Sequence, residues 1–193
     1  MWLVEEFDMS TEPLETAIAS TRNVLAGVSN SQLEDSTPCA KWNVADLINH
    51  IVGSQFYFAS ALSGEIADGE EPNFSDGDYL ATFDVGSNLL LEAFQGEGVM
   101  DQMVTLPFGE LPGSSFVGLA ANDTFTHGWD LAKATGQNTD LSPELAEQLL
   151  AGSKMNLPPS LRNDEGHPFG FEKTAPSGAS GADQLAAFLG RQV

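Results

Sequence analysis

The side chains best suited to chemistry in this sequence are an aspartate and a histidine spaced one helical turn apart. Asp123 and His127 lie in the segment NDTFTHGWDLAKATGQ, where a separation of four residues brings both side chains to one helix face. The rest of that face is apolar: Phe116, Ala120, Leu131 and Ala134. An ionised aspartate on a buried face is costly unless it is paired or binds a metal. The polar pair therefore requires an explanation.

Three interpretations compete for Asp123 and His127. The two side chains could form an ion pair within their helix, or they could face water at the edge of a helical bundle. They could also ligate a metal, as pairs of residues on one helix do in bundle metalloproteins. The spacing does not decide among the three, because Asp-x-x-x-His is a weak motif by itself.

His50 is the third candidate ligand. It lies on the flank of the apolar stripe of a second helix, where a partly buried, hydrogen-bonded histidine is the simpler interpretation. If His50 meets Asp123 and His127, the set of two histidines and one carboxylate suits zinc with a water in an open position. Nickel or ferrous iron fits as well, because residue identity does not select the metal. Three protein ligands leave coordination positions free, which is typical of a reactive site.

Other residues around these segments have both a functional and a structural interpretation. Asp46 and Asp130 could each orient a neighbouring histidine, or each could have a structural role, which for Asp46 is the third position of a capping box. Cys39 precedes the second helix, whose N-terminus can lower the pKa of a thiol, but a packed small apolar residue is the simpler interpretation. Tyr57 is a candidate for lining a substrate pocket, or it packs at a helix interface with its hydroxyl satisfied.

Two further assignments are structural. His167 lies in a Gly- and Pro-rich segment, and a loop histidine of this kind is expected to be solvated rather than to serve as a fourth ligand. Trp42 and Trp129 are expected to anchor the core.

Capping residues and apolar periodicity predict the helices that must position these side chains. Asn43 and Asp46 predict the start of the second helix at capping-box spacing, and Gly64 predicts its end. Ser75 and Asp78 have the same spacing and predict the opening of the third helix. Ser180 and Asp183 likewise predict the opening of a short last helix. The predicted helices cover residues 12–28, 44–63, 76–95, 114–135, 143–157 and 183–191.

The connections are of two kinds. Residues 97–113 contain β-branched residues, prolines and glycines, and predict a loop or a short hairpin. Residues 158–181 are rich in Pro, Gly and Ser and predict an irregular wrap before the last helix. Amphipathic helices with short connections predict a mainly all-α, four-helix-bundle fold in a single domain over 1–193.

Composition narrows the range of partners. The chain has 28 acidic and 7 basic residues and a formal charge of −21, which excludes the basic stripes that nucleic acids and anionic membranes require. The single cysteine, Cys39, allows no intrachain disulfide and fits a reducing compartment. The first residues lack the basic region of a signal peptide, and no segment has the length of a membrane span. We expect a cytoplasmic protein with a small-molecule substrate and a soluble acidic surface.

Two segments resemble the signature segments of a bacterial metal-binding family. They are TPCAKWNVADLINHIVG at 37–53 and NDTFTHGWDLAKATGQ at 122–137. The family belongs to the DinB-like superfamily and includes the N-terminal domain of mycothiol-dependent maleylpyruvate isomerase. The matching positions are Trp42, Val44, Asp46, Leu47 and His50 in the first segment, and Asp123, His127, Trp129, Asp130, Leu131 and Ala132 in the second. LPFG at 106–109 and FLGR at 188–191 also resemble family segments.

The resemblance implies a DinB-like four-helix bundle that holds a divalent metal at His50, Asp123 and His127. In the isomerase branch the carboxylate ligand is a glutamate, one methylene longer than Asp123. The isomerase also has an additional C-terminal domain that contributes to its active site, for which this chain has no room. We therefore do not expect maleylpyruvate isomerisation.

Three functional hypotheses follow from these patterns. The first is a metal-dependent enzyme, a transferase or hydrolase that uses a low-molecular-weight thiol as cosubstrate, as the resemblance implies. The second is a metal-binding module without turnover, which a closed coordination shell would favour. The third is a structural bundle whose histidines are incidental, which the metal content of untagged protein would distinguish from the other two.

Overall fold

The computed structural model describes residues 10–64, 72–107, 109–163 and 169–193. Its elements follow in the order α1 (Glu12–Ala26), η1 (Asn30–Gln32), α2 (Val44–Ser63), α3 (Tyr79–Phe94), β1 (Met103–Leu106), β2 (Gly109–Pro112), α4 (Gly113–Ala134), α5 (Pro143–Asn156), η2 (Pro159–Leu161) and α6 (Gly181–Phe188). The mainly helical class predicted from the sequence is confirmed.

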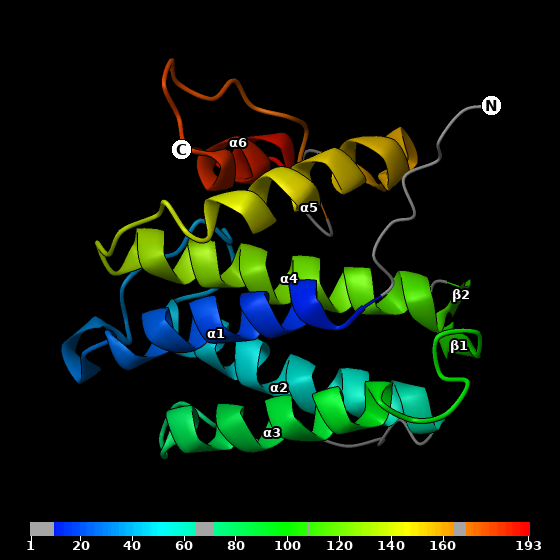
Figure 1. The fold of residues 1–193 in the computed structure, drawn as a ribbon. Coiled ribbons are helices and arrows are strands. Elements are labelled where there is room, and N and C mark those ends of the chain that lie inside the picture. Colours follow the sequence, from blue (N-terminus) through cyan, green and yellow to red (C-terminus); the bar gives the residue numbers. More distant parts are fainter. Residues whose placement is uncertain (1–9, 65–71, 108, 164–168) are drawn as a thin grey trace.

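Helices α1 to α4 lie side by side and form the main body of the protein (Figure 1). Helix α1 packs against α4, and α2 packs against both α3 and α4. Helices α5 and α6 pack on each other beside α4, and a two-stranded antiparallel hairpin of β1 and β2 precedes α4. The hairpin agrees with the prediction for residues 97–113. Among the described residues, no helix combines the length and apolar character that a membrane span requires.

The core consists of two apolar clusters that the central helices share. One contains Phe116, Phe125, Trp129 and Leu185 and joins α4 to α6. The other joins α2 to α4 through Leu47, Ile48, Ile51 and Leu131. Burial of these side chains is the dominant stabilising term of the fold. It also holds α2 and α4, the two helices that carry the candidate ligands, against each other.

Local capping decides where the helices begin. Asp78 is itself the N-cap of α3, because its carboxylate accepts from Ala81 N at 3.0 Å. The prediction that Ser75 opens this helix was therefore wrong: the Ser75 hydroxyl donates to Asn73 Oδ1 instead. At α6, the Ser180 hydroxyl accepts from Asp183 N at 3.1 Å, as predicted.

The capping box of α2 leads to a first testable prediction. Asn43 Oδ1 accepts from Asp46 N at 2.9 Å, and Asp46 Oδ2 accepts from Asn43 N at 3.1 Å. Asn43→Ala should lower the free energy of unfolding by about 1 kcal/mol, because backbone donors at the helix start lose their partner. Urea unfolding followed by circular dichroism measures the difference.

The control is the same change in the middle of a helix. Asn88 is exposed on α3, so Asn88→Ala should be neutral or slightly stabilising, since alanine has the higher helix propensity. Equal destabilisation by both changes would contradict the role of Asn43 as a cap.

Candidate metal centre

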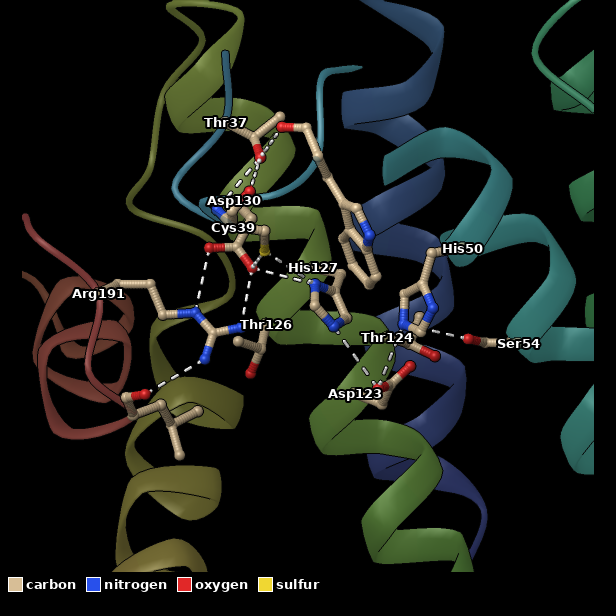
Figure 2. A network of polar contacts seen from close by, with 12 residues as sticks. Thr37, Cys39, His50, Ser54, Asp123, Thr124, Thr126, His127, Asp130 and Arg191 are labelled. Atoms are coloured by element: carbon tan, nitrogen blue, oxygen red, sulfur yellow. Dashed lines mark hydrogen bonds and ion pairs between the residues drawn. The ribbon is translucent and has the colours of Figure 1, made fainter. Parts of the chain in front are cut away.

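His50, Asp123 and His127 converge where α2 faces α4 (Figure 2). Asp123 Oδ1 lies 3.7 Å from His50 Nε2 and 3.7 Å from His127 Nε2. One ligand atom from each residue lies within 4.8 Å of the other two. The three residues singled out from the sequence are thus neighbours in space, as the metal interpretation requires.

The arrangement has features that fit a cation. The distance of 3.7 Å exceeds that of a hydrogen bond, but it is close to the roughly 3.4 Å that separates two tetrahedral ligands of one zinc ion. Asp123 Oδ2 is buried and has no hydrogen-bond partner among the described residues. A buried unpaired carboxylate oxygen is costly, and a bound cation would offset that cost.

Electrostatics keep the Asp123 carboxylate ionised, which is the form that can bind a cation. Burial acts to raise the pKa of Asp123, but His50, His127 and Ser54 outweigh burial, and its pKa is lowered. The side chains of His50, Asp123 and His127 are 31%, 25% and 12% exposed. The trio is therefore reachable from solvent on the side of His50 and Asp123, where a small molecule could approach.

Polar contacts in the core set the register of α2 against α4 next to the trio. Gln55 is fully buried, and its amide donates to Thr124 Oγ1 at 3.1 Å and to Ile51 O at 3.3 Å. From α1, the Thr21 hydroxyl donates to Thr124 O at 2.8 Å. Gln55 and Thr21 thus both contact Thr124, the residue that follows Asp123. The position of Asp123 therefore depends on α1, α2 and α4.

Trp42 forms a wall of the candidate site. Its ring centroid lies 4.7 Å from that of His50 and 5.7 Å from that of His127. The expectation of a core anchor is met by Trp129, which is 1% exposed, whereas Trp42 is only partly buried and contacts both histidines. An aromatic ring at this place restricts water on one side of the trio.

Asp130 lies behind His127. The His127 ring spans the two aspartates: its Nε2 faces Asp123, and its Nδ1 lies 3.0 Å from Asp130 Oδ2. A carboxylate only accepts hydrogen bonds, so this contact requires a proton on Nδ1. In the neutral ring that arrangement leaves the Nε2 lone pair directed at the other two candidate ligands. Of the two interpretations considered for Asp130, the structure supports orientation of a histidine. Asp46, in contrast, is exposed and caps α2.

Arg191 completes this network and was not anticipated from the sequence. Its Nε lies 3.2 Å from Asp130 Oδ1, and its Nη2 lies 3.0 Å from Asp130 Oδ2. Asp130 is fully buried. Burial acts to raise the pKa of Asp130, but Arg191 and the hydrogen bond from His127 lower it well below its usual range. The only sequence signal was the arginine that ends the FLGR segment.

The Cys39 thiol also donates to Asp130 Oδ2, at 3.3 Å. Burial and the nearby charge of Asp130 raise the pKa of this thiol far above its usual value, which does not favour a reactive thiolate. Cys39, His127 and Asp130 are close enough to form a second ligand set, but the Arg191 guanidinium already neutralises Asp130 and would repel a cation there.

Two of the remaining sequence candidates receive no functional support from the structure. The Tyr57 ring is partly buried and packs edge-on against Phe58, with centroids 5.8 Å apart, so its pocket role stays a prediction. His167 lies outside the described residues.

Comparison with known proteins defines the class of this chain. It belongs to the family of the mycothiol maleylpyruvate isomerase N-terminal domain, whose model matches residues 14–132. That range contains His50, Asp123 and His127 but ends well before Arg191.

The sequence match to two similar proteins extends over almost the whole chain. The uncharacterized proteins Rv0738 and MT0763 of Mycobacterium tuberculosis, from strains H37Rv and CDC 1551, are each 43% identical over 170 residues. The alignment covers 88% of this chain and 91% of either relative. No solved structure gave a significant match.

Proposed function

We propose that this protein is a divalent-metal-dependent enzyme that uses a low-molecular-weight thiol to act on a small molecule, by thiol transfer or hydrolysis. The observation that carries the proposal is the convergence of His50, Asp123 and His127 beside a buried, unpartnered Asp123 Oδ2. Zinc is the first choice of metal, with nickel or iron as alternatives, because two imidazoles and one carboxylate suit all three.

The family supplies the second part of the proposal. Its name refers to a mycothiol-dependent isomerase, so the thiol proposed here is mycothiol or a similar small thiol. A bound divalent ion would act as a Lewis acid and lower the pKa of a thiol or a water. The proposed setting is the cytoplasm, where thiols are kept reduced.

The protein's own residues have distinct roles in this proposal. Asp123 supplies the negative charge that offsets the cation, and the two imidazoles supply neutral nitrogen ligands. Trp42 restricts water beside the histidines, and the Ser54 hydroxyl lies 3.4 Å from His50 Nε2, a contact that a bound metal would replace. The partial exposure of His50 and Asp123 leaves a direction of approach for the substrates.

The first experiment is elemental analysis of untagged protein after incubation with zinc. We expect about one equivalent of metal in the wild type and almost none in His127→Ala, because three ligands are the minimum for a site of this kind. Asp46→Ala is the matched control: Asp46 has the same spacing to His50 as Asp123 has to His127, but it caps a helix and should be dispensable for metal.

The outcome separates the competing functions. Absence of metal from wild-type protein after exposure to zinc, nickel, manganese and anaerobic ferrous iron would refute both metal hypotheses and leave a structural bundle. If metal is bound, the loaded protein is assayed for thiol consumption with small electrophiles. Metal without exchangeable water and without thiol-dependent turnover would favour a binding module.

A further inference from the structure

We infer that Arg191, at the C-terminal end of the chain, is a positioning residue of the candidate metal site and acts on His127 through Asp130. The role of Arg191 in metal binding rests on the proposed metal function, whereas the contacts from which we infer that role do not depend on that proposal. It extends the site beyond the region that the family model matches.

The contacts run without a break from Arg191, which lies just after α6, to the candidate ligand His127. Arg191 meets Asp130 through two nitrogens, at 3.2 and 3.0 Å, and Asp130 Oδ2 accepts from His127 Nδ1 at 3.0 Å (Figure 2). A two-point contact with a planar guanidinium holds both the position and the plane of the carboxylate. The plane of Asp130 then sets the direction of the acceptor that the His127 ring must face.

Burial of these side chains lets the contacts favour one tautomer and one orientation of the His127 ring. Asp130 is 0% exposed, and the Arg191 and His127 side chains are 11% and 12% exposed. Little water is therefore available to offer His127 Nδ1 another partner. With Nδ1 occupied by the carboxylate, the ring presents Nε2 toward His50 and Asp123, which is the orientation that a ligand requires.

Without Arg191, the Asp130 carboxylate and the His127 ring would no longer be held in one orientation. Among the described residues, Asp130 would then contact only His127 and Cys39, both through Oδ2, and Oδ1 would lose its partner. The carboxylate could then rotate to reach solvent, and the His127 ring would sample both tautomers and more than one orientation. A lysine would keep the charge but not the two-point contact.

Arg191 also has a structural contact that must be separated from positioning. Its Nη1 lies 3.3 Å from Leu189 O, so a substitution could act by loosening α6. Arg162 is the matched control. It donates to Phe188 O at 2.7 Å and to Gly170 O at 2.8 Å, and its guanidinium lies 4.4 Å from the centre of the Phe188 ring. Arg162 therefore ties down the same segment without a contact to Asp130.

The test compares wild type, Arg191→Met, Arg191→Lys and Arg162→Ala with two measurements. Long-range ¹⁵N–¹H NMR of metal-free protein reports the His127 tautomer, and competition with a chromophoric chelator reports zinc affinity. We expect Nδ1-protonated His127 in the wild type, and mixed tautomers with an about 10- to 100-fold loss of affinity in Arg191→Met. Arg191→Lys should lie between the two, and Arg162→Ala should match the wild type.

The inference is overturned if Arg191→Met keeps the wild-type His127 tautomer and zinc affinity. It is also overturned if Arg162→Ala mixes the tautomers and lowers the zinc affinity as strongly as Arg191→Met does. Circular dichroism identifies any variant that does not fold, and Arg191→Lys then decides the question. Failure of the wild type to bind zinc would refute the metal function, while the tautomer comparison in metal-free protein would still decide whether Arg191 positions His127.

Discussion

Replacing Gly128 with alanine should destabilise the protein by about 2–3 kcal/mol, since overpacking at a rigid helix contact exceeds the gain in helix propensity. A Cβ at this position would overlap Thr21 Oγ1 and lie 3.1 Å from Thr21 Cβ and 3.3 Å from Thr21 Cα. The last of these is backbone, so α1 and α4 would have to separate. The Thr21 hydroxyl would also lose its hydrogen bond to Thr124 O.

The control lies in the same helix. Gly118 is exposed on α4, and a Cβ there would meet nothing within 4 Å. Gly118→Ala should therefore stabilise the protein by up to about 1 kcal/mol through helix propensity alone. Urea unfolding of both variants gives the comparison. If Gly128→Ala proved as stable as Gly118→Ala, the close approach of α1 to α4 would be wrong.

The parts of the fold that the sequence predicted are those in which the interacting residues are close along the chain. Asn43 and Asp46 are three residues apart, as are Ser180 and Asp183, and both pairs make the expected capping contacts. The error at α3 has a local cause as well. Ser75 and Asp78 have the spacing of a capping box, but aspartate is also a strong N-cap, and the pattern does not say which of the two residues opens the helix.

The candidate site depends on contacts between distant parts of the chain. The Asp123 and His127 pair could be found from helical spacing, but the approach of His50 could not, and that expectation came from the family resemblance. Arg191 is 61 residues from Asp130, and no periodicity links the two. The position of Trp42 against the histidines likewise results from packing of the segment before α2, which the apolar pattern does not specify.

The buried charge pair behind the site predicts the largest effect on stability. Asp130→Asn should lower the free energy of unfolding by roughly 3–5 kcal/mol, because removing one partner leaves the other charge buried without compensation. Arg191 is 11% exposed and would retain its positive charge beside a neutral amide. The amide nitrogen of the substituted side chain could also not accept a hydrogen bond from His127 or Arg191.

The pH dependence of this effect follows from the direction of the pKa shift. The pKa of Asp130 is lower in the folded protein than in the unfolded chain, where it is about 3.9. The stability that ionised Asp130 contributes is therefore fully present at pH values above its pKa in the unfolded chain. It is lost as the pH falls through the lower pKa that Asp130 has in the folded protein. The difference between wild type and Asp130→Asn should therefore shrink as the pH falls below about 4 into strong acid.

Asp84→Asn is the matched control, since it breaks another aspartate–arginine pair of the described residues. Asp84 bonds Arg22 at 2.6 Å, but their side chains are 37% and 43% exposed, so solvent replaces the lost contact and the effect should be small. Denaturant unfolding of both variants at several pH values tests the contrast. Similar losses would mean that burial does not distinguish the two pairs, and that water reaches Asp130 and Arg191 in solution. In that case Arg191 could not restrict His127 to one orientation, because water would offer His127 Nδ1 another partner.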